Sequence, residues 1–287
     1  MGVPARIVLY AQSSEAAERA ARAAFARFAA LEDVASDYRP TSELMRLCAH
    51  AGGPPVPVSP DLFRMLQQAQ TIARRSGGAF DVTVGPYVAL WRQARRSGKL
   101  PALREIREAR RRVGWQKLRL DPTERTAHLR IGGMRLDLGG IAKGDACDQA
   151  QRELRRHGVT RALVEAGGDI VAGDPPPGEK GWRIEIAEGG SGVVLLANRA
   201  VSTSGDTEQF VEIGGRRYAH IVDPRTGLGL TDRFAATVFA PDGLTSDPLA
   251  TAACVLGPER GEALVRSFPD ASVTLRRAGS KGPVLGA

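Results

Sequence analysis

The sequence has few features of a scaffold held by disulfides or metals, and none of a membrane-spanning protein. Its 287 residues include only three cysteines, Cys48, Cys147 and Cys254, which lie far apart and form no CxxC pair. Their odd number and wide spacing argue against a disulfide framework and a zinc site, so we expect buried free thiols. No apolar run approaches the roughly 18 residues that a membrane-spanning helix needs, so we expect no transmembrane segment.

A secretion signal is not visible either. The N-terminal stretch MGVPARIVLYAQ lacks a basic segment followed by an apolar one. This leaves the compartment in which the protein works open.

The positive charge does not follow the pattern of a nucleic-acid-binding protein. The net charge is +8, carried by arginines along the expected helices with acids between them, as in LREIREARRRVG. Aromatic residues make up only 5% of the chain, and no module combines aromatic with basic residues. We therefore expect solvated helix faces and no nucleic-acid partner.

Hydrophobic periodicity predicts helices in the first half of the chain, with short strands between them. We expect helices over 13–38, 59–78 and 101–114, and one that begins near Ala142 and ends at Gly158. Short strands are expected over the ranges 5–11, 80–84, 115–121, 126–132 and 134–140.

The second half is mostly strands. Short apolar runs with glycine turns extend from Arg161 to Pro241, and a helix over 247–268 and a strand over 271–277 follow. Such dense strands favour an antiparallel sheet. We therefore expect one α+β domain over residues 1–287, with a mixed, largely antiparallel sheet and flanking helices. A division into two sublobes remains open.

The turn LDLGGIAKGDACDQA, residues 136–150, contains one of only five lysines in the chain, Lys143. Gly139 and Gly140 allow a sharp turn into a helix, and the amide groups at a helix start attract anions. A lysine there adds a compact charge that can reach a phosphate oxygen. The turn matches neither GxGxxG nor GxxxxGK[ST], and the plain alternative is a solvated lysine at a helix entry.

The stretch TSDPLATA, residues 245–252, carries a carboxylate and a hydroxyl four residues apart. If a helix begins at Asp247 or Pro248, the side chains of Asp247 and Thr251 face the same side. Hard oxygen ligands of this kind suit Mg²⁺, which usually shares its shell with substrate phosphates. The alternative is that Asp247 caps the helix, with Pro248 at the next position.

Three further segments contain polar side chains that could contact a ligand. In SDYRPTSEL, residues 36–44, the loop either lines a pocket or is a turn between helices capped by Ser42. In FDVTVGP, residues 80–86, Asp81 and Thr83 share one strand face, which either holds a planar ring or is an exposed edge. In EAGGDIVAG, residues 165–173, Asp169 either receives a ligand hydroxyl or N–H group or is the tip of a hairpin turn.

A histidine also stands out in the strand-rich half. In YAHIVDPRTG, residues 218–227, His220 is either a general base or a residue of structural importance only.

Taken in order, these segments resemble the FAD:protein FMN transferase family, also called the ApbE family. The resemblance rests on SDYRPTSEL, FDVTVGP, LDLGGIAKG, AGGDI, STSG, HIVDPRTG and SDPLATA, and it runs from about Gly2 to Gly257.

The resemblance implies an activity and its partners. FMN would pass from FAD, the substrate, to a threonine or serine of an acceptor flavoprotein, with Mg²⁺ as cofactor and AMP as the leaving product. It also implies site residues, each by its position in a matching motif. The metal ligands would be the Ala142 carbonyl, Asp247 and Thr251, and the catalytic residues His220, Asp247 and Lys143. The residues in flavin- and adenine-binding segments would be Tyr38, Ser42, Glu43, Phe80, Asp81, Lys143, Asp169, Thr203 and His220. Relatives are mostly exported and often membrane-anchored.

One departure from the family pattern bears on the outcome of the reaction. The family commonly has asparagine at the end of SELxxLN, where this chain has Cys48. Two alternatives therefore stay open: a Mg²⁺-dependent FAD pyrophosphatase that gives FMN and AMP, and a non-catalytic FAD-binding protein.

Overall fold

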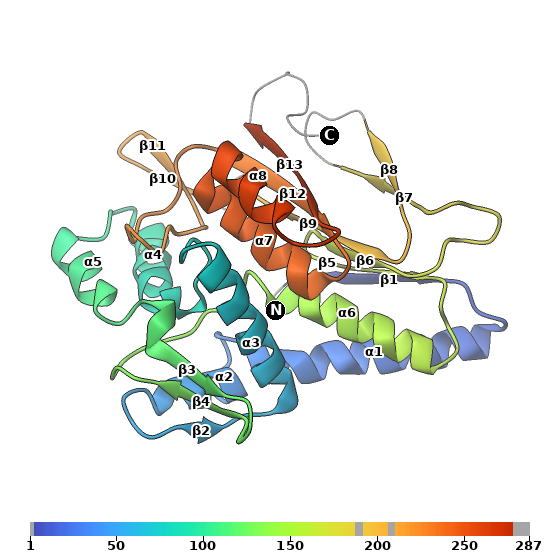
Figure 1. The fold of residues 1–287 in the computed structure, drawn as a ribbon, viewed down its shortest axis with the longest axis horizontal. Helices are drawn as coiled ribbons and strands as arrows, with labels where there is room; N and C mark the ends of the chain where they lie inside the picture. Colours follow the sequence, from blue (N-terminus) through green and yellow to red (C-terminus); the bar gives the residue numbers. More distant parts are fainter. Residues whose placement is uncertain (1–2, 187–191, 206–209, 278–287) are drawn as a thin grey trace.

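A six-stranded antiparallel sheet forms the centre of the molecule in the computed structural model, which describes residues 3–186, 192–205 and 210–277 (Figure 1). Its strand order is β1-β5-β6-β9-β12-β13, and every neighbouring pair is antiparallel. The strands are β1 (Ala5–Leu9), β5 (Ala162–Ala166), β6 (Asp169–Ala172), β9 (Arg199–Ser204), β12 (Phe234–Ala240) and β13 (Ser272–Arg277). The α+β prediction is confirmed.

Helices cover one face of this sheet. Apolar side chains of α1 (Ser14–Ala35) and α6 (Ala142–Arg156) pack on β5, β6 and β9 in one buried cluster. Next to them, α7 (Gly243–Leu256) and α8 (Pro258–Arg266) pack on β12 and β13, in a second cluster that also holds α2 (Glu43–Ala49) and α3 (Pro60–Arg75). The hairpin of β7 (Trp182–Glu185) and β8 (Val193–Leu196) packs against residues of β5, β6 and β9 in a separate cluster.

Smaller elements flank the helices. A three-stranded sheet joins β2 (Val56–Pro57), β4 (Thr126–Leu129) and β3 (Leu118–Asp121). A third group packs α4 (Gly85–Ser97) and α5 (Leu103–Arg110) against β10 (Phe210–Ile213) and β11 (Arg216–Ala219). Two short 3-10 helices are η1 (Val82–Val84) and η2 (Trp115–Lys117).

Several predicted details are confirmed. Helices occur where they were expected over 13–38 and 59–78: α1 follows the cap Ser13, and α3 follows the cap Ser59 with Pro60 in its first turn. The helix that starts at Ala142 is followed by Gly158 in the left-handed region, with φ of +77°. All three cysteines are buried free thiols. No helix in the described part of the chain is both long and apolar enough to span a bilayer.

The expected strand over 80–84 is wrong. These residues lead into η1, because the Asp81 carboxylate accepts from the Thr83 N–H and fixes a tight turn. Gly85 and Pro86 then open α4 instead of ending a strand, since proline fits the first turn of a helix. The sequence analysis missed α4 for this reason. Residues 134–140 are not a strand either: 134–138 have no regular secondary structure, and 139–140 form a turn.

The last predicted helix begins earlier and is interrupted. It starts at Gly243, capped by Asp242, whose side chain accepts from the Thr245 N–H. Asp247 therefore lies inside the helix, and its alternative interpretation as the cap is wrong. Gly257, with φ of +77°, separates α7 from α8, where the sequence predicted one continuous helix over 247–268.

Candidate active site at the crossing of two helices

The start of α6 lies directly against the start of α7. A Cβ atom built on Gly144 would lie 2.1 Å from the Gly243 carbonyl oxygen, and one on Gly243 would lie 2.4 Å from the Gly144 carbonyl oxygen. Only glycine permits this approach, because any larger residue would push the two backbones apart. The contact brings the turn 139–144 next to residues 247–251 of α7.

Lys143 lies between two buried carboxylates at this crossing. Its Nζ is 2.8 Å from Asp169 Oδ2 and 3.3 Å from Asp247 Oδ2, and it donates to the Gly139 carbonyl at 3.2 Å. Asp169 opens β6 and Asp247 belongs to α7, and each is 2% exposed. The alternatives of a solvated lysine and of an exposed hairpin tip at Asp169 are therefore wrong.

The two acids influence the ionisation of the cluster. Burial, followed by the charge of Asp169, raises the pKa of Asp247 to about 7, against the lowering effect of Lys143. Burial by itself would lower the pKa of Lys143, but the charges of Asp247 and Asp169 raise it above its ordinary value. Lys143 therefore stays protonated, and two carboxylates share one ammonium group.

Ala142 and Thr251 lie at the same crossing. The Gly144 N–H donates to Asp247 Oδ2 at 3.2 Å, and a Cβ atom on Gly140 would meet Thr251 Oγ1 at 3.0 Å. Ala142 lies between those two glycines, so the turn and the α7 residues run alongside each other. The structure thus brings together residues 142, 143, 169, 247 and 251.

The oxygens at this crossing are of the type that holds a hard cation. A main-chain carbonyl, a carboxylate and a hydroxyl suit Mg²⁺, and two buried carboxylates facing one ammonium leave negative charge to be balanced. No group of three or more His, Cys, Asp or Glu side chains suited to a metal occurs in the described ranges. The predicted donors, the Ala142 carbonyl, Asp247 and Thr251, include a single acid, and their chemistry fits the ion.

Two serines of β9 that the sequence analysis did not name contact α7, whereas the predicted Thr203 between them points to the opposite face of the sheet. Ser202 Oγ is 2.7 Å from Ser246 Oγ, Ser204 Oγ is 3.2 Å from Thr251 Oγ1, and Thr203 Oγ1 is 3.0 Å from its β12 neighbour Thr237. Ser202 and Ser204 thus hold α7 to the sheet on either side of the predicted Thr203.

Asp148 of α6 is a residue that the sequence analysis missed. Its carboxylate accepts from the Gly243 and Leu244 N–H groups at 2.9 and 2.8 Å and so fixes the start of α7. Burial, opposed by the Gly243 hydrogen bond, raises the pKa of Asp148 to about 7. The sequence feature that could have pointed to Asp148 is its position one helical turn beyond Gly144, on the same side of the helix.

We expect Asp148 to make folding stability depend on pH. Its pKa is near 3.8 in the unfolded chain and about 7 when folded, so the native state binds the extra proton between these values. The contribution of this proton is greatest below about pH 4 and is lost as the pH rises toward 7, at up to about 1.4 kcal/mol per pH unit. Urea unfolding across this range should show a steeper decline for the wild type than for Asp148→Asn. Parallel curves for the two proteins would contradict the assignment.

Ser42 and Glu43, in the segment 36–44, form hydrogen bonds that hold the helices in place. Ser42 is the N-cap of α2, accepts from the Met45 N–H and donates to the Ser36 carbonyl, which confirms the interpretation as a cap. Glu43 Oε1 accepts from the Ser59 N–H at 2.6 Å and ties α2 to the start of α3. Tyr38 is 71% exposed, with the Arg92 guanidinium 4.2 Å from its ring centre.

The remaining predicted residues are Phe80, Asp81 and His220. The Phe80 ring is 3.3 Å from the Cβ position of Gly140, so it borders the turn. The Asp81 carboxylate is buried and accepts from the N–H and hydroxyl of Thr83. His220 directly follows β11 and is exposed. The ligand-contacting roles of these residues stay predictions.

Comparisons with known proteins agree on one family. Residues 1–275 match the model of the ApbE family. The FAD:protein FMN transferase of Treponema pallidum (strain Nichols) is 37% identical over 258 residues, which cover 83% of this chain and 71% of that protein. That of Klebsiella pneumoniae (strain 342) is 33% identical over 277 residues, which cover 94% of this chain and 84% of that protein.

Solved structures of similar proteins have the same fold. The flavin transferase ApbE from Vibrio cholerae superimposes with a TM-score of 0.83 at 29% identity, over 99% of this chain and 96% of that one. The apo form of the Pseudomonas stutzeri flavinyl transferase ApbE gives 0.86 at 30% identity, over 99% and 94%.

Proposed function

The chain belongs to the ApbE family, and we propose that it is an FAD:protein FMN transferase. In the proposed reaction, a threonine or serine hydroxyl of an acceptor flavoprotein attacks the FMN phosphorus of FAD. The bond to the bridging oxygen of the pyrophosphate breaks, AMP leaves, and a phosphoester forms. The observation that carries this proposal is the Lys143 ammonium held at the start of a helix between two buried carboxylates.

Three oxygens at the helix crossing would hold the Mg²⁺ ion: the Ala142 carbonyl, the Asp247 carboxylate and the Thr251 hydroxyl. When bound, the cation withdraws charge from the diphosphate. Phosphoryl transfer depends mainly on positioning and charge neutralisation, so a site without a covalent nucleophile suits it.

Lys143 would bind the diphosphate. Its ammonium is already oriented by Asp169, Asp247 and the Gly139 carbonyl, so little side-chain freedom is lost when a phosphate oxygen arrives. The N–H groups of Ala142, Gly144 and Asp145 are already engaged, with the Leu138 carbonyl, Asp247 Oδ2 and the Ile141 carbonyl. The Lys143 side chain would therefore make the contact from this turn.

The proton of the acceptor hydroxyl needs a base. His220, or Asp247 through a water molecule, would accept it. Both assignments belong to the proposal.

The proposal is tested by incubating the protein with FAD, Mg²⁺ and a target flavoprotein. Mass spectrometry should find one added FMN on a threonine or serine of the target, with one AMP released for each FMN attached. AMP released at the same rate without an acceptor would instead identify an FAD pyrophosphatase. Bound FAD with neither AMP nor labelled target would identify a non-catalytic flavin-binding protein.

A further inference from the structure

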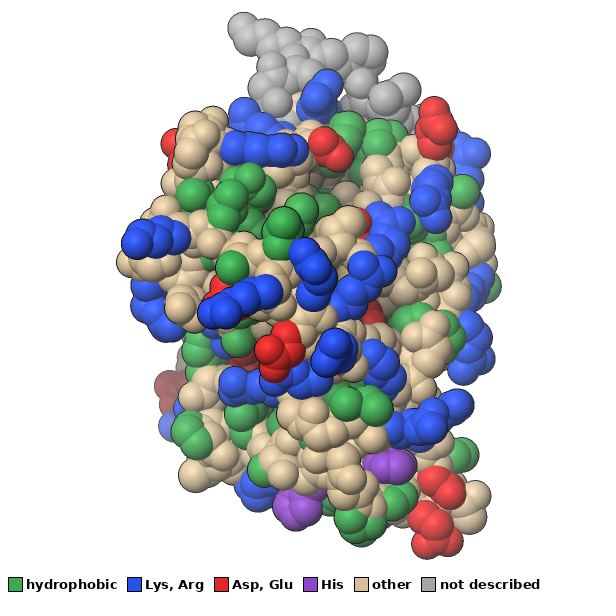
Figure 2. All heavy atoms as spheres, turned by 90° about the vertical axis from the view of Figure 1, so that its left-hand side faces the viewer, with side chains coloured by type: hydrophobic (Ala, Val, Ile, Leu, Met, Phe, Trp, Pro, Cys, Tyr) green, Lys and Arg blue, Asp and Glu red, His purple; other side chains and the backbone are tan. Residues whose placement is uncertain are grey.

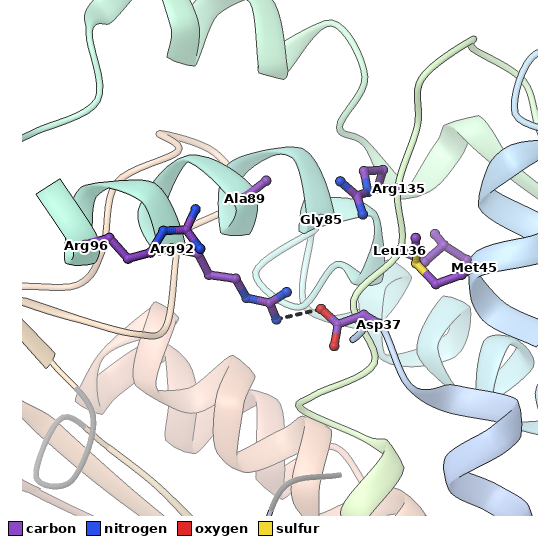
Figure 3. A pocket seen from close by; sticks show the side chains of 8 residues that line it. All are labelled: Asp37, Met45, Gly85, Ala89, Arg92, Arg96, Arg135 and Leu136. Atoms are coloured by element: carbon purple, nitrogen blue, oxygen red, sulfur yellow. Dashed lines mark ion pairs between the residues drawn. The ribbon is translucent and has the colours of Figure 1, made fainter. Parts of the chain in front are cut away.

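A basic pocket lies beside the candidate site, with a volume of about 160 Å³. One wall is a stripe of α4 formed by Gly85, Ala89, Arg92 and Arg96, at the spacing of one helix face. This stripe points away from the face of α4 that packs on α5. The other walls are Asp37, Met45, Arg135 and Leu136. Figure 3 shows the Arg92 side chain reaching from α4 to Asp37, with Arg96 one turn further along α4 and Arg135 on the neighbouring segment.

The pocket has an excess of positive charge. Its one acid, Asp37, pairs with Arg92 at 2.5 Å. Arg96 and Arg135 are exposed, and neither forms an ion pair with any of the described residues. Two guanidinium groups therefore face an open hollow without a counter-charge, which is the arrangement that recognises a carboxylate or a phosphate.

The surrounding surface strengthens this charge. Residues 92–112 contain nine lysines and arginines but only two glutamates, so this stretch alone carries +7 of the net +8. Glu105 accepts from the Ala102 N–H, and Glu108 pairs with Arg112, so both glutamates are engaged within the stretch. Figure 2 shows the side of the molecule on which α4 and α5 lie, and Lys and Arg side chains spread over it and outnumber the acids. Such a field attracts acidic partners over a distance.

The pocket is linked to the candidate site through Arg92. The guanidinium of Arg92 also lies 3.5 Å from Asp137 Oδ2 and 4.2 Å from the Tyr38 ring centre. Asp137 in turn accepts from the Gly139 N–H, in the turn that leads to Lys143. A polypeptide seated on the pocket would therefore lie next to the turn that we assign to the diphosphate.

We propose that the pocket formed by Arg92, Arg96 and Arg135 binds an acidic side chain of the acceptor protein, close to the hydroxyl that is modified. This inference rests on the proposed function, because an acceptor must reach the diphosphate from the surface. It assigns acceptor recognition to α4 and residue 135, apart from the residues that hold FAD.

The test uses two fluorescent peptides, each with one threonine flanked either by four glutamates or by four glutamines. Fluorescence anisotropy measures their binding to the FAD-loaded protein. The wild type should bind the glutamate peptide at least about 10-fold more tightly, since charge-assisted pairs with arginine are stronger than neutral ones. The double variant Arg96→Gln/Arg135→Gln should lose this preference. Arg95→Gln/Arg107→Gln removes the same charge from exposed positions outside the pocket and should change the affinity less than about threefold.

Three outcomes would overturn the proposal. The first is equal affinity of the wild type for both peptides. The second is an equal loss of peptide affinity in the two double variants. The third is that the pocket variant loses only binding to phosphatidylglycerol vesicles, which would assign the pocket to a lipid headgroup. FAD affinity, measured without peptide, should be the same in all variants. A wild type that neither binds FAD nor releases AMP would refute the proposed function, whereas peptide selectivity without a pocket effect would refute only this inference.

Discussion

Replacing Asp247 by alanine lowers the rate of FMN transfer by at least about 1000-fold in our account, which corresponds to about 4 kcal/mol of transition-state stabilisation. The substitution removes the only carboxylate of the proposed metal ligand set and leaves Lys143 paired with Asp169 alone. Both effects reduce neutralisation of the diphosphate. The measurement is the initial rate of FMN attachment, determined by mass spectrometry at saturating FAD.

The matched control for this variant is Asp242→Asn. It removes a carboxylate from the same helix, five residues earlier, and asparagine caps a helix nearly as well as aspartate. We expect the control to transfer FMN within about threefold of the wild type. An Asp247→Ala protein that transfers FMN as fast as the control would show that the metal assignment is wrong.

Gly144→Ala should have the largest effect on folding among single substitutions at the site. Its new methyl group would lie 2.1 Å from the Gly243 carbonyl oxygen and 2.6 Å from the Gly243 carbonyl carbon, so α6 and α7 must separate. We expect a loss of about 3 kcal/mol in the free energy of unfolding, the upper range for overpacking. Transfer should fall more than about 100-fold, because Lys143 and Asp247 lie on the two helices that move apart.

Gly132→Ala is the comparison for this variant. The nearest atom to a Cβ at that position is the Ala51 carbonyl oxygen, at 3.9 Å, and the backbone does not need glycine there. Urea unfolding should place this protein within about 0.5 kcal/mol of the wild type. A Gly144→Ala protein of equal stability would mean that the helices do not meet at this crossing.

The sequence predicted the parts of the site that depend on local chemistry. Lys143 was identified because a lysine at a glycine turn into a helix is unusual, and Asp247 and Thr251 because four residues make one helical turn. Asp169 was identified because a carboxylate in an apolar run must either be paired inside the protein or reach the solvent. The structure pairs it with Lys143.

The parts that sequence reasoning missed depend on contacts between distant segments. In the sequence, Asp148 looks like an ordinary acid on a helix. In the folded protein, its carboxylate accepts hydrogen bonds from the Gly243 and Leu244 N–H groups of α7. The strand error at 80–84 has a partly local origin. Alternation of apolar and polar residues fits a strand, but Asp81 uses its side chain locally, and Gly85 packs its backbone against Arg135.

Composition alone does not show which arginines are paired with acids. Acids between the arginines of residues 101–114 suggested solvated helix faces, and Arg104, Arg107 and Arg110 are exposed. Composition did not show that Glu105 contacts the backbone and Glu108 contacts Arg112, so most of these arginines remain without an acidic partner in the described structure.

The central claim is that the turn at residues 139–144 and the helical turn at 247–251 together hold a divalent cation and the diphosphate of FAD. Anomalous diffraction from crystals grown with FAD and Mn²⁺ in place of Mg²⁺ tests it most directly. The account predicts one manganese peak that contacts the Ala142 carbonyl, Asp247, Thr251 and the diphosphate, with Lys143 on a phosphate oxygen. A diphosphate bound away from Lys143, or a manganese peak that contacts none of the three protein oxygens, would contradict it.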